Sequence, residues 1–170
     1  MSPMRRLPPQ VSVRTPSFKG LRPASDASSR SMQGNRSKNT KPELLLRKEL
    51  RARGLRCRTH VGELPGRPDL VFPTVRATVF CDGDFWHGRN WRRLKHQLAR
   101  RFNADYWIAK IARNRKRDRS QAAALKRLGW HVVRYWESDI RSSPRAVADR
   151  LQETLAIYSA QSLSQGESAN

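Results

Sequence analysis

The chain has 170 residues, with 35 Lys and Arg against 14 Asp and Glu, which gives a formal net charge of +21 at pH 7. This length suits one domain with its own core and is too short for two domains of ordinary size. Such an excess of positive charge indicates a polyanionic partner, and DNA or RNA is favoured over a membrane because no apolar run is long enough to span a bilayer. Two cysteines are too few for a disulfide framework and no stretch reads as a secretory signal, so we expect a cytoplasmic protein associated with the nucleoid.

The two ends of the chain differ in composition from its middle. Residues 1–39 contain Pro, Ser, Arg and Gly without a sustained apolar period, which predicts a disordered basic arm. The arm could add salt-sensitive phosphate contacts, or it could be a solvated tail without a role. The folded domain is predicted to span 40–159, and the polar residues 160–170 are predicted to form a flexible tail.

The first half of the folded part predicts a helix and three strands. Thr40 is a suitable N-cap for a helix with a leucine face that ends at Gly54. Residues 55–60 alternate between apolar and polar side chains and predict a first strand, and the apolar runs 70–72 and 77–80 predict the second and third.

The second half predicts a loop, a long helix, a strand and a last helix. Residues 88–96 are basic and aromatic without a clear period and predict an exposed loop. Residues 105–128 have a helical pattern that Gly129 ends, 130–136 predict a fourth strand, and Pro144 begins the last helix. Consecutive strands allow antiparallel pairing, whereas the strand–helix–strand crossover requires a parallel pair. We therefore predict an α/β fold with a mixed β-sheet flanked by helices.

The central stretch, residues 64–87, gathers acids and a histidine at the ends of neighbouring strands. Asp69 follows a Pro-Gly-Arg-Pro turn, and the third strand runs into Asp82, shortly before an aromatic pair and His87. A carboxylate at the start of one strand and a histidine-bearing cluster at the end of its neighbour can gather metal ligands and a proton acceptor at one sheet edge. The stretch therefore predicts an active site.

Each of these residues also has a plainer interpretation. Asp69 and Asp82 could be turn acids, and His87 could be an ordinary loop histidine. Glu43 lies where the dipole of the first helix favours an acid. The aromatic pair 85–86 could belong to the core.

Three further side chains have open interpretations. Trp107 has the spacing of a buried helix face, although an exposed position is also possible. Cys57 and Cys81 could bind zinc from neighbouring strands, but no CxxC or HxxxH spacing supports this. Two buried thiols are the better interpretation of the pair.

Several short motifs, taken in order, make the chain similar to a known family. They span about 37–155 and are Thr40-Lys41-Pro42-Glu43, Leu64 to Phe72, Asp82 to His87, Tyr106-Trp107, Lys110-Ile111, Asn114, Arg117-Asp118, Gly129-Trp130 and Arg134 to Glu137. The chain thereby resembles the very short patch repair endonucleases. The resemblance implies a restriction-endonuclease-like fold and a magnesium-dependent enzyme that nicks double-stranded DNA at T:G mismatches. It also makes mismatch-repair proteins candidate partners, and we expect a monomer.

The resemblance implies roles for individual residues. Asp69 matches the family's metal-binding aspartate, and His87 matches the catalytic histidine that activates water. Cys81 stands where the prototype has threonine, and because the backbone carbonyl binds the metal there, the changed side chain need not abolish the site. Glu43 matches an acid near the metal-bound water, and Asp82 is a supporting catalytic candidate. The expected DNA contacts are Phe85, Trp86, Trp107, Lys110 and Arg117. The three aromatic residues match side chains of the family that insert into the base stack.

The chain departs from the family at its structural zinc site. The places of the usual zinc ligands hold Asp84, Arg89 with Trp91, and Ser138. Every thiolate is gone from them, so we predict that structural zinc is absent. The loop with His87 must then be held by packing and hydrogen bonds, and we expect it to be more mobile than in zinc-bearing relatives.

Three functions remain open on the sequence alone. The first is a magnesium-dependent nicking endonuclease of mismatch repair. The second is a general or restriction-associated DNA nuclease without mismatch specificity. The third is a non-catalytic DNA-binding module, which the high charge and the lost zinc ligands would also suit.

Overall fold

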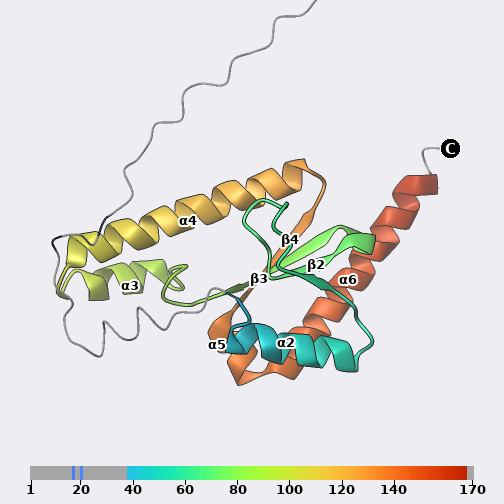
Figure 1. Ribbon diagram of the computed structural model, residues 1–170, viewed down its shortest axis with the longest axis horizontal. Coiled ribbons are helices and arrows are strands. Elements are labelled where there is room, and N and C mark those ends of the chain that lie inside the picture. The colour runs from blue at the N-terminus through green and yellow to red at the C-terminus, as the bar shows by residue number, and fades with distance from the viewer. Residues whose placement is uncertain (1–16, 18–19, 21–37, 168–170) are drawn as a thin grey trace, which may run out of the picture.

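The computed structural model describes Ser17, Gly20 and residues 38–167, and in this part four strands form one mixed sheet in the order β1-β2-β3-β4 (Figure 1). β1 (Arg58–Thr59), β2 (Leu70–Phe72) and β3 (Ala77–Asp82) pair antiparallel. β4 (His131–Trp136) pairs parallel to β3. The predicted α/β class, with its mixed sheet, is confirmed.

Helices cover both faces of the sheet (Figure 1). On one face, α2 (Lys41–Ala52) packs against α5 (Glu137–Ser142) and α6 (Pro144–Glu167). On the other face, α4 (Ala104–Arg127) packs on β4 and has α3 (Trp91–Leu98) beside it. A short 3-10 helix, η1 (Pro73–Val75), connects β2 to β3.

The main core lies between the sheet and the face that carries α2, α5 and α6. Its buried members are Leu46, Leu50, Leu70, Phe72, Ala77, Val79, Ile140, Val147, Ala148, Leu151 and Leu155. Because side chains alternate along a strand, Ala77 and Val79 face this core while Thr78, Phe80 and Asp82 face α4. The end of β3 therefore presents an acid to the long helix.

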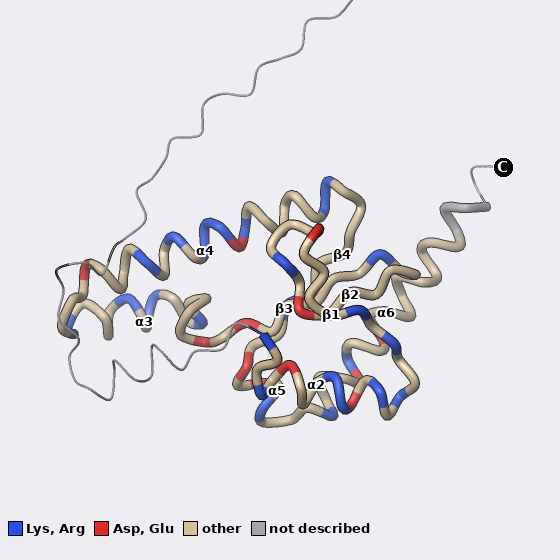
Figure 2. Tube along the Cα trace, in the orientation of Figure 1, with Lys and Arg blue, Asp and Glu red and all other residues tan. Residues whose placement is uncertain are grey.

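The long helix α4 carries both a buried stripe and a basic surface. Ile111, Asp118 and Leu125 are buried at a spacing of seven residues, which keeps them on one face of the helix. Lys and Arg lie along α3 and α4 where these two helices extend past the sheet (Figure 2). One charged residue, Asp118, thus occupies a position where an apolar side chain would be expected.

Two predicted segments differ from the structure. The loop predicted at 88–96 is wrong in its second part, because Trp91–Leu98 forms α3, which packs on α4 and buries Leu98. The first strand is shorter than 55–60, because only Arg58 and Thr59 pair with β2. The other predicted helices and strands are present close to their expected positions.

The C-terminal part also differs from the prediction. Residues 160–167 are not a tail that begins at 160, because α6 continues to Glu167. The short helix α5 directly after β4 was not predicted. The predicted N-terminal arm, 1–39, lies outside the described residues except for four positions. None of the helices within 38–167 has the length and apolar composition that crossing a membrane requires.

Candidate active site

Asp69 lies at the start of β2 and reaches across to the end of β3. Its backbone N–H donates to the carbonyl of Val79 at 3.0 Å, and its Oδ2 accepts the backbone N–H of Cys81 at 2.7 Å. Burial, followed by the negative charges of Glu43 and Asp82, raises the pKa of Asp69 to about 7 despite the Cys81 hydrogen bond. The carboxylate therefore lies in a region of negative potential that a bound cation would relieve.

Glu43 is buried in the first turn of α2, where it forms a capping box. Its carboxylate accepts the backbone N–H of Asn39 at 2.9 Å, the backbone N–H of Thr40 at 3.2 Å and the Thr40 hydroxyl at 2.7 Å. The helix-terminal interpretation of Glu43 is thus confirmed. Its charge also raises the pKa of Asp69, which places it near that carboxylate, while its expected role beside a metal-bound water stays a prediction.

Asp82, at the end of β3, is almost fully buried and bound by Arg134 of β4. Arg134 donates from Nε to Oδ2 at 2.6 Å and from Nη2 to Oδ1 at 2.7 Å, a two-point ion pair. Oδ1 of Asp82 also lies 3.5 Å from Nδ1 of His87. Asp82 is therefore part of the site and not a solvent-exposed turn acid. Because Arg134 occupies both of its oxygens, it suits fixing local charge better than direct metal binding.

His87 follows β3 and is oriented by α4. Its Nδ1 lies 2.7 Å from Oδ2 of Asp118. Burial raises the pKa of Asp118, but the hydrogen bond and charge of His87 and the charges of Arg134 and Arg117 outweigh it and hold this pKa below its ordinary value. An ionised carboxylate on Nδ1 assigns the ring proton to that nitrogen and leaves Nε2 as the base.

The loop that carries His87 is docked on α4. Asn114 of α4 donates from Nδ2 to the carbonyl of Trp86 at 2.9 Å. Gly88 has a φ of +68°, and a Cβ there would lie 3.0 Å from Cγ2 of Ile111. Glycine is needed at this position both for its backbone conformation and for the close approach to the helix.

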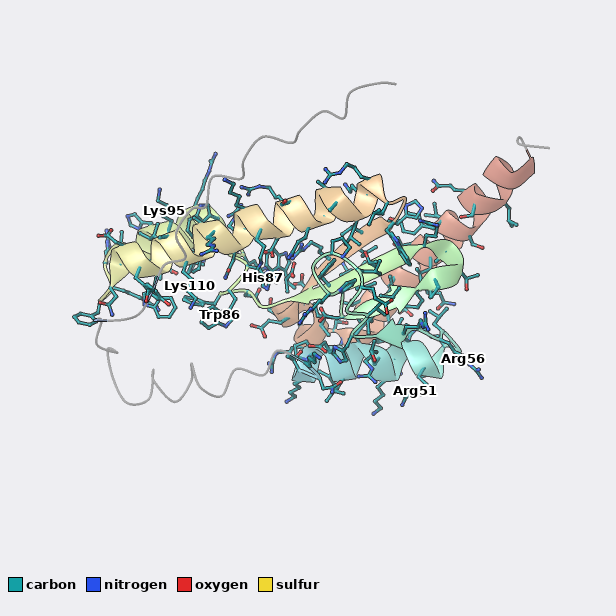
Figure 3. All side chains as sticks on the ribbon, turned by 45° about the horizontal axis from the view of Figure 1, so that its top comes forward. Arg51, Arg56, Trp86, His87, Lys95 and Lys110 are labelled. Carbon is teal, nitrogen blue, oxygen red and sulfur yellow. The ribbon has the colours of Figure 1, made fainter. Side chains whose placement is uncertain are left out.

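The expected wedge residues form one cluster, and in Figure 3 its member Trp86 lies close to Lys110. The ring centroids of Phe85 and Trp86 are 5.1 Å apart, and that of Trp107 lies 5.6 Å and 5.9 Å from them. Lys110 lies over the rings of Trp86 and Trp107 at 5.7 Å and 5.9 Å, and its Nζ donates to Oη of Tyr106 at 2.8 Å. We call these five residues the aromatic cluster. Its rings are half-buried, so they are neither core residues nor freely exposed.

A cleft of about 660 Å³ opens on another side of His87. Arg67, Arg117 and Arg134 line it together with His87 and Asp118. The side chain of Arg117 is 53% exposed and is thus accessible to a ligand in the cleft. The expected DNA contacts therefore fall into two groups around His87, with Arg117 on the cleft and the others in the aromatic cluster.

The donors at the expected magnesium site are few but of the right type. Within the described residues, no group of three or more His, Cys, Asp or Glu side chains is arranged to hold a metal ion. Magnesium, however, commonly keeps several waters and takes only one or two carboxylates from the protein. Asp69 and the backbone carbonyl of Cys81 supply oxygen donors in a region of negative potential, so these residues fit magnesium.

The places of the usual zinc ligands do not fit zinc. Asp84 and Ser138 are bridged there by Arg89, whose Nη1 lies 3.1 Å from Oδ1 of Asp84 and also bonds Oγ of Ser138. Trp91 packs instead under the guanidinium of Arg115, at 5.4 Å from the ring centroid. Arginine and tryptophan offer zinc no donor, and the guanidinium charge would repel the ion.

Comparison with known proteins places the chain in a family. A family model described as DNA mismatch endonuclease Vsr matches residues 24–93. The type II nicking enzyme V.NmeDIP of Neisseria meningitidis serogroup C is 41% identical over 73% of this chain and 82% of its own length. The chain belongs to the Vsr family. The DNA mismatch endonuclease Vsr of Escherichia coli (strain K12) is 33% identical over 75% of this chain and 80% of its own length. As a Vsr-family protein, the chain is an endodeoxyribonuclease that acts on DNA.

Two residues at this Vsr-family site, Asp118 and Arg134, were not among the expected site residues. A signal for Asp118 was present in the sequence, because an acid halfway between Ile111 and Leu125 interrupts the buried stripe of α4. Arg134 is the charged residue in a strand that is otherwise mostly apolar and aromatic. Its partner could not be read from the sequence, because the pairing depends on the register of β3 and β4.

Proposed function

We propose that this DNA-nicking endonuclease of the Vsr family cuts one strand of double-stranded DNA at a T:G mismatch, with Mg²⁺ as its cofactor. The observation that carries the proposal is the pair of His87 and Asp118, 2.7 Å apart, at the same sheet edge as the half-buried carboxylate of Asp69. A base with a fixed tautomer near a metal-binding acid supports hydrolysis of a phosphodiester.

In the proposed mechanism, Asp69 and the backbone carbonyl of Cys81 hold the magnesium ion. The bound ion supplies charge neutralisation at the scissile phosphate. His87 accepts the proton of the attacking water at Nε2, because Asp118 keeps the ring proton on Nδ1. Asp118 then stabilises the imidazolium that forms, as a neighbouring carboxylate does in other base–acid pairs. Arg117 binds the DNA backbone along the cleft.

The aromatic cluster supports recognition of a mismatch. Inserting rings between base steps costs a few kcal/mol of unstacking, and this cost is least where pairing is already weak. Phe85 and Trp86 directly precede His87 in the same loop, so their insertion would set His87 against a phosphate close to the disturbed base pair. The location of the cut would thus follow from the location of the mismatch.

The catalytic assignment can be tested on a supercoiled plasmid that carries one T:G mismatch. With Mg²⁺, we expect Asp69→Ala and His87→Ala each to lower the nicking rate by at least about a thousandfold. Lys126→Ala serves as the control, because it removes a charge at the exposed end of α4, and it should nick at the wild-type rate. Full activity in both site variants would contradict the assignment.

A second function, nicking without mismatch specificity, is compatible with the names of two relatives, which do not mention a mismatch. Proteins 43% and 41% identical to this chain, from Xanthomonas oryzae and Neisseria meningitidis, are called type II nicking enzymes. Comparing matched with T:G-mismatched duplexes separates the two functions. The proposal expects a preference of at least about tenfold for the mismatch, because the unstacking cost is lower there. Equal rates would favour the second function and leave the roles of Asp69 and His87 intact.

We further propose that the enzyme is a monomer and holds no structural zinc. Its nicks would then serve mismatch-repair proteins. A nicking rate that rises in proportion to enzyme concentration supports a monomer, and a steeper dependence counts against it. Metal analysis of the purified protein should find less than one zinc per chain. One tightly held zinc ion would overturn this part of the proposal.

A further inference from the structure

Four polar side chains join the loop that carries His87 to the start of α5. Arg89 donates from Nη1 to Oδ1 of Asp84 at 3.1 Å and from Nη2 to Oδ1 of Asp139 at 2.8 Å. Its Nη1 also bonds Oγ of Ser138. Ser138 in turn donates its backbone N–H to Oδ2 of Asp84 at 3.0 Å and its hydroxyl to Oδ1 at 2.7 Å. We call these four residues the clip.

The register of the sheet brings the clip together. β3 and β4 are parallel and pair as far as Asp82 and Trp136, so both strands end at the same edge of the sheet. Two residues further along each chain, Asp84 and Ser138 meet. The Asp84 carboxylate satisfies a backbone N–H in the first turn of α5, where helices leave such groups unpaired. The guanidinium of Arg89 lies over the ring of Trp136, 5.8 Å from its centroid.

Asp84 and Arg89 also close the turn that contains His87. The backbone N–H of Arg89 donates to the carbonyl of Asp84 at 2.8 Å, and that of His87 donates to the carbonyl of Gly83 at 3.0 Å. Phe85 and Trp86 lie inside the same turn. A restraint on positions 84 and 89 therefore restrains the proposed base and two rings of the aromatic cluster together.

We propose that the clip takes the place of a structural metal and positions His87, Phe85 and Trp86 through charge and hydrogen bonds. The part of this proposal that concerns nicking rests on the proposed function, whereas the part that concerns the order of the loop does not. Arg89, Asp84, Ser138 and Asp139 are positioning residues that act through His87. They supply the hydrogen bonds that the loop requires in the absence of zinc ligands.

The exposure of the clip determines how it should respond to salt. The side chains of Arg89, Asp84 and Asp139 are 31%, 28% and 39% exposed, so water and salt weaken each ion pair. The strength of the clip comes from its connectivity, because Arg89 has three partners and Asp84 accepts from two residues. Salt should therefore loosen the loop, and removing trace metals should not.

A competing role for Arg89 is direct contact with a DNA phosphate. Arg89 borders a pocket of about 380 Å³ that Arg93 and Arg101 also line, and a phosphate would fit such surroundings. Two carboxylates already neutralise Arg89, which argues against this role. The two roles predict opposite effects for Asp84→Asn. If Arg89 is a positioning residue, removing the Asp84 charge loosens the loop. If Arg89 contacts a DNA phosphate, the same change frees its guanidinium and tightens DNA binding.

The test compares Arg89→Met and Asp84→Asn with wild type by hydrogen–deuterium exchange of residues 83–90 and by steady-state nicking. We expect both variants to speed exchange in this segment by about tenfold and to lower kcat by about tenfold, with KM changed less than about twofold. Arg127→Met is the matched control, because it also removes one arginine charge but lies at the exposed end of α4. Arg89→Lys should recover part of the loss.

Several results would overturn the clip. Unchanged exchange of residues 83–90 in both variants would do so, as would a higher KM for Arg89→Met joined with tighter DNA binding by Asp84→Asn. Loosening by a zinc chelator in the wild-type protein would show that a metal holds the loop. If wild type fails to nick DNA at all, the proposed function is wrong, but the exchange and chelator measurements still decide the clip. Unchanged helix content by circular dichroism distinguishes a loosened loop from an unfolded variant.

Discussion

The acids of the site lie in two regions of opposite electrostatic character. Beside α4, Asp82 is bound at two points by Arg134, and Asp118 is bound by His87. At the start of β2, burial and the neighbouring acids instead raise the pKa of Asp69 to about 7. The first region is balanced by the protein itself and suits proton transfer. The second keeps an uncompensated charge unless it takes up a proton or a cation, and a cation bound there would serve the proposed magnesium-dependent chemistry.

The largest effect on the nicking rate should come from removing the charge of Asp69. Asp69→Asn keeps the shape and the acceptor for the backbone N–H of Cys81 but cannot neutralise a magnesium ion. We expect nicking to fall by at least about a thousandfold, as measured over a range of Mg²⁺ concentrations. Recovery of the wild-type rate at high Mg²⁺ would show that the Asp69 region is not the main metal site.

Removing the partner of the base should have a smaller effect on the rate. Asp118→Asn leaves the side-chain size unchanged but no longer fixes the tautomer of His87 or stabilises its charged form. We expect kcat to fall by about a hundredfold with little change in KM. Asp105→Asn, in the exposed first turn of the same helix, is the control. A loss confined to KM would assign Asp118 to DNA binding instead.

The balanced region should also contribute to folding. Arg134→Met leaves the buried carboxylate of Asp82 without its two-point partner, and breaking such a pair costs about 3 kcal/mol of unfolding free energy. Urea unfolding of this variant and of Arg127→Met measures the difference. Equal stability in the two variants would mean that Asp82 finds another partner, and the contrast between the regions would weaken.

Removing the charge of Asp69, in contrast, should raise the free energy of unfolding. Because the pKa of Asp69 is about 7 in the folded protein and 3.8 ordinarily, ionising it destabilises the folded state, and the cost grows from about pH 4 until it is complete above pH 7. Without metal, Asp69→Asn should thus be more stable than wild type by roughly 2 kcal/mol at pH 8 and equal to it near pH 4. Thermal melting with a chelator present measures this. A less stable variant at pH 8 would contradict the cause assigned to the pKa.

The smallest effect is expected at Cys81. Its backbone carbonyl is the proposed metal donor, so Cys81→Ala should nick within about twofold of wild type although the side chain packs against the core. The nicking assay at saturating Mg²⁺ checks this. A loss comparable with that of Asp69→Asn would give the thiol itself a role in the metal region.

The local sequence pattern predicted the helices and strands that bury an apolar face in the core. The apolar runs of β2 and β3 are buried as predicted, and so are Leu46 and Leu50 on the leucine face of α2, whereas Leu44 is 49% exposed. Helix α3 was missed although Trp91, Leu94 and Leu98 recur at helical spacing, because the predicted loop ended at residue 96, before Leu98, which is the one residue of α3 that is fully buried. The first strand was overpredicted because alternation marks an extended segment but does not ensure a pairing partner for each residue.

The site was predictable as a set of residue types but not as a set of contacts. The motifs named Asp69, His87 and Glu43, and the structure brings them to one sheet edge. The pairs of Asp82 with Arg134 and of Asp84 with Ser138 depend on the register of two parallel strands that are far apart in sequence. Whether the loop with His87 is more mobile than in zinc-bearing relatives stays a prediction, although the packing and hydrogen bonds expected to hold it are present.

The most direct test of the central claim is to map the cut on an end-labelled duplex with a single T:G mismatch. In Mg²⁺, the account predicts one nick, in one strand, next to the mismatched thymine, for the wild-type protein and none for Asp69→Asn. Cutting of both strands, equal cutting of the fully matched duplex, or an unchanged nick in Asp69→Asn would contradict it.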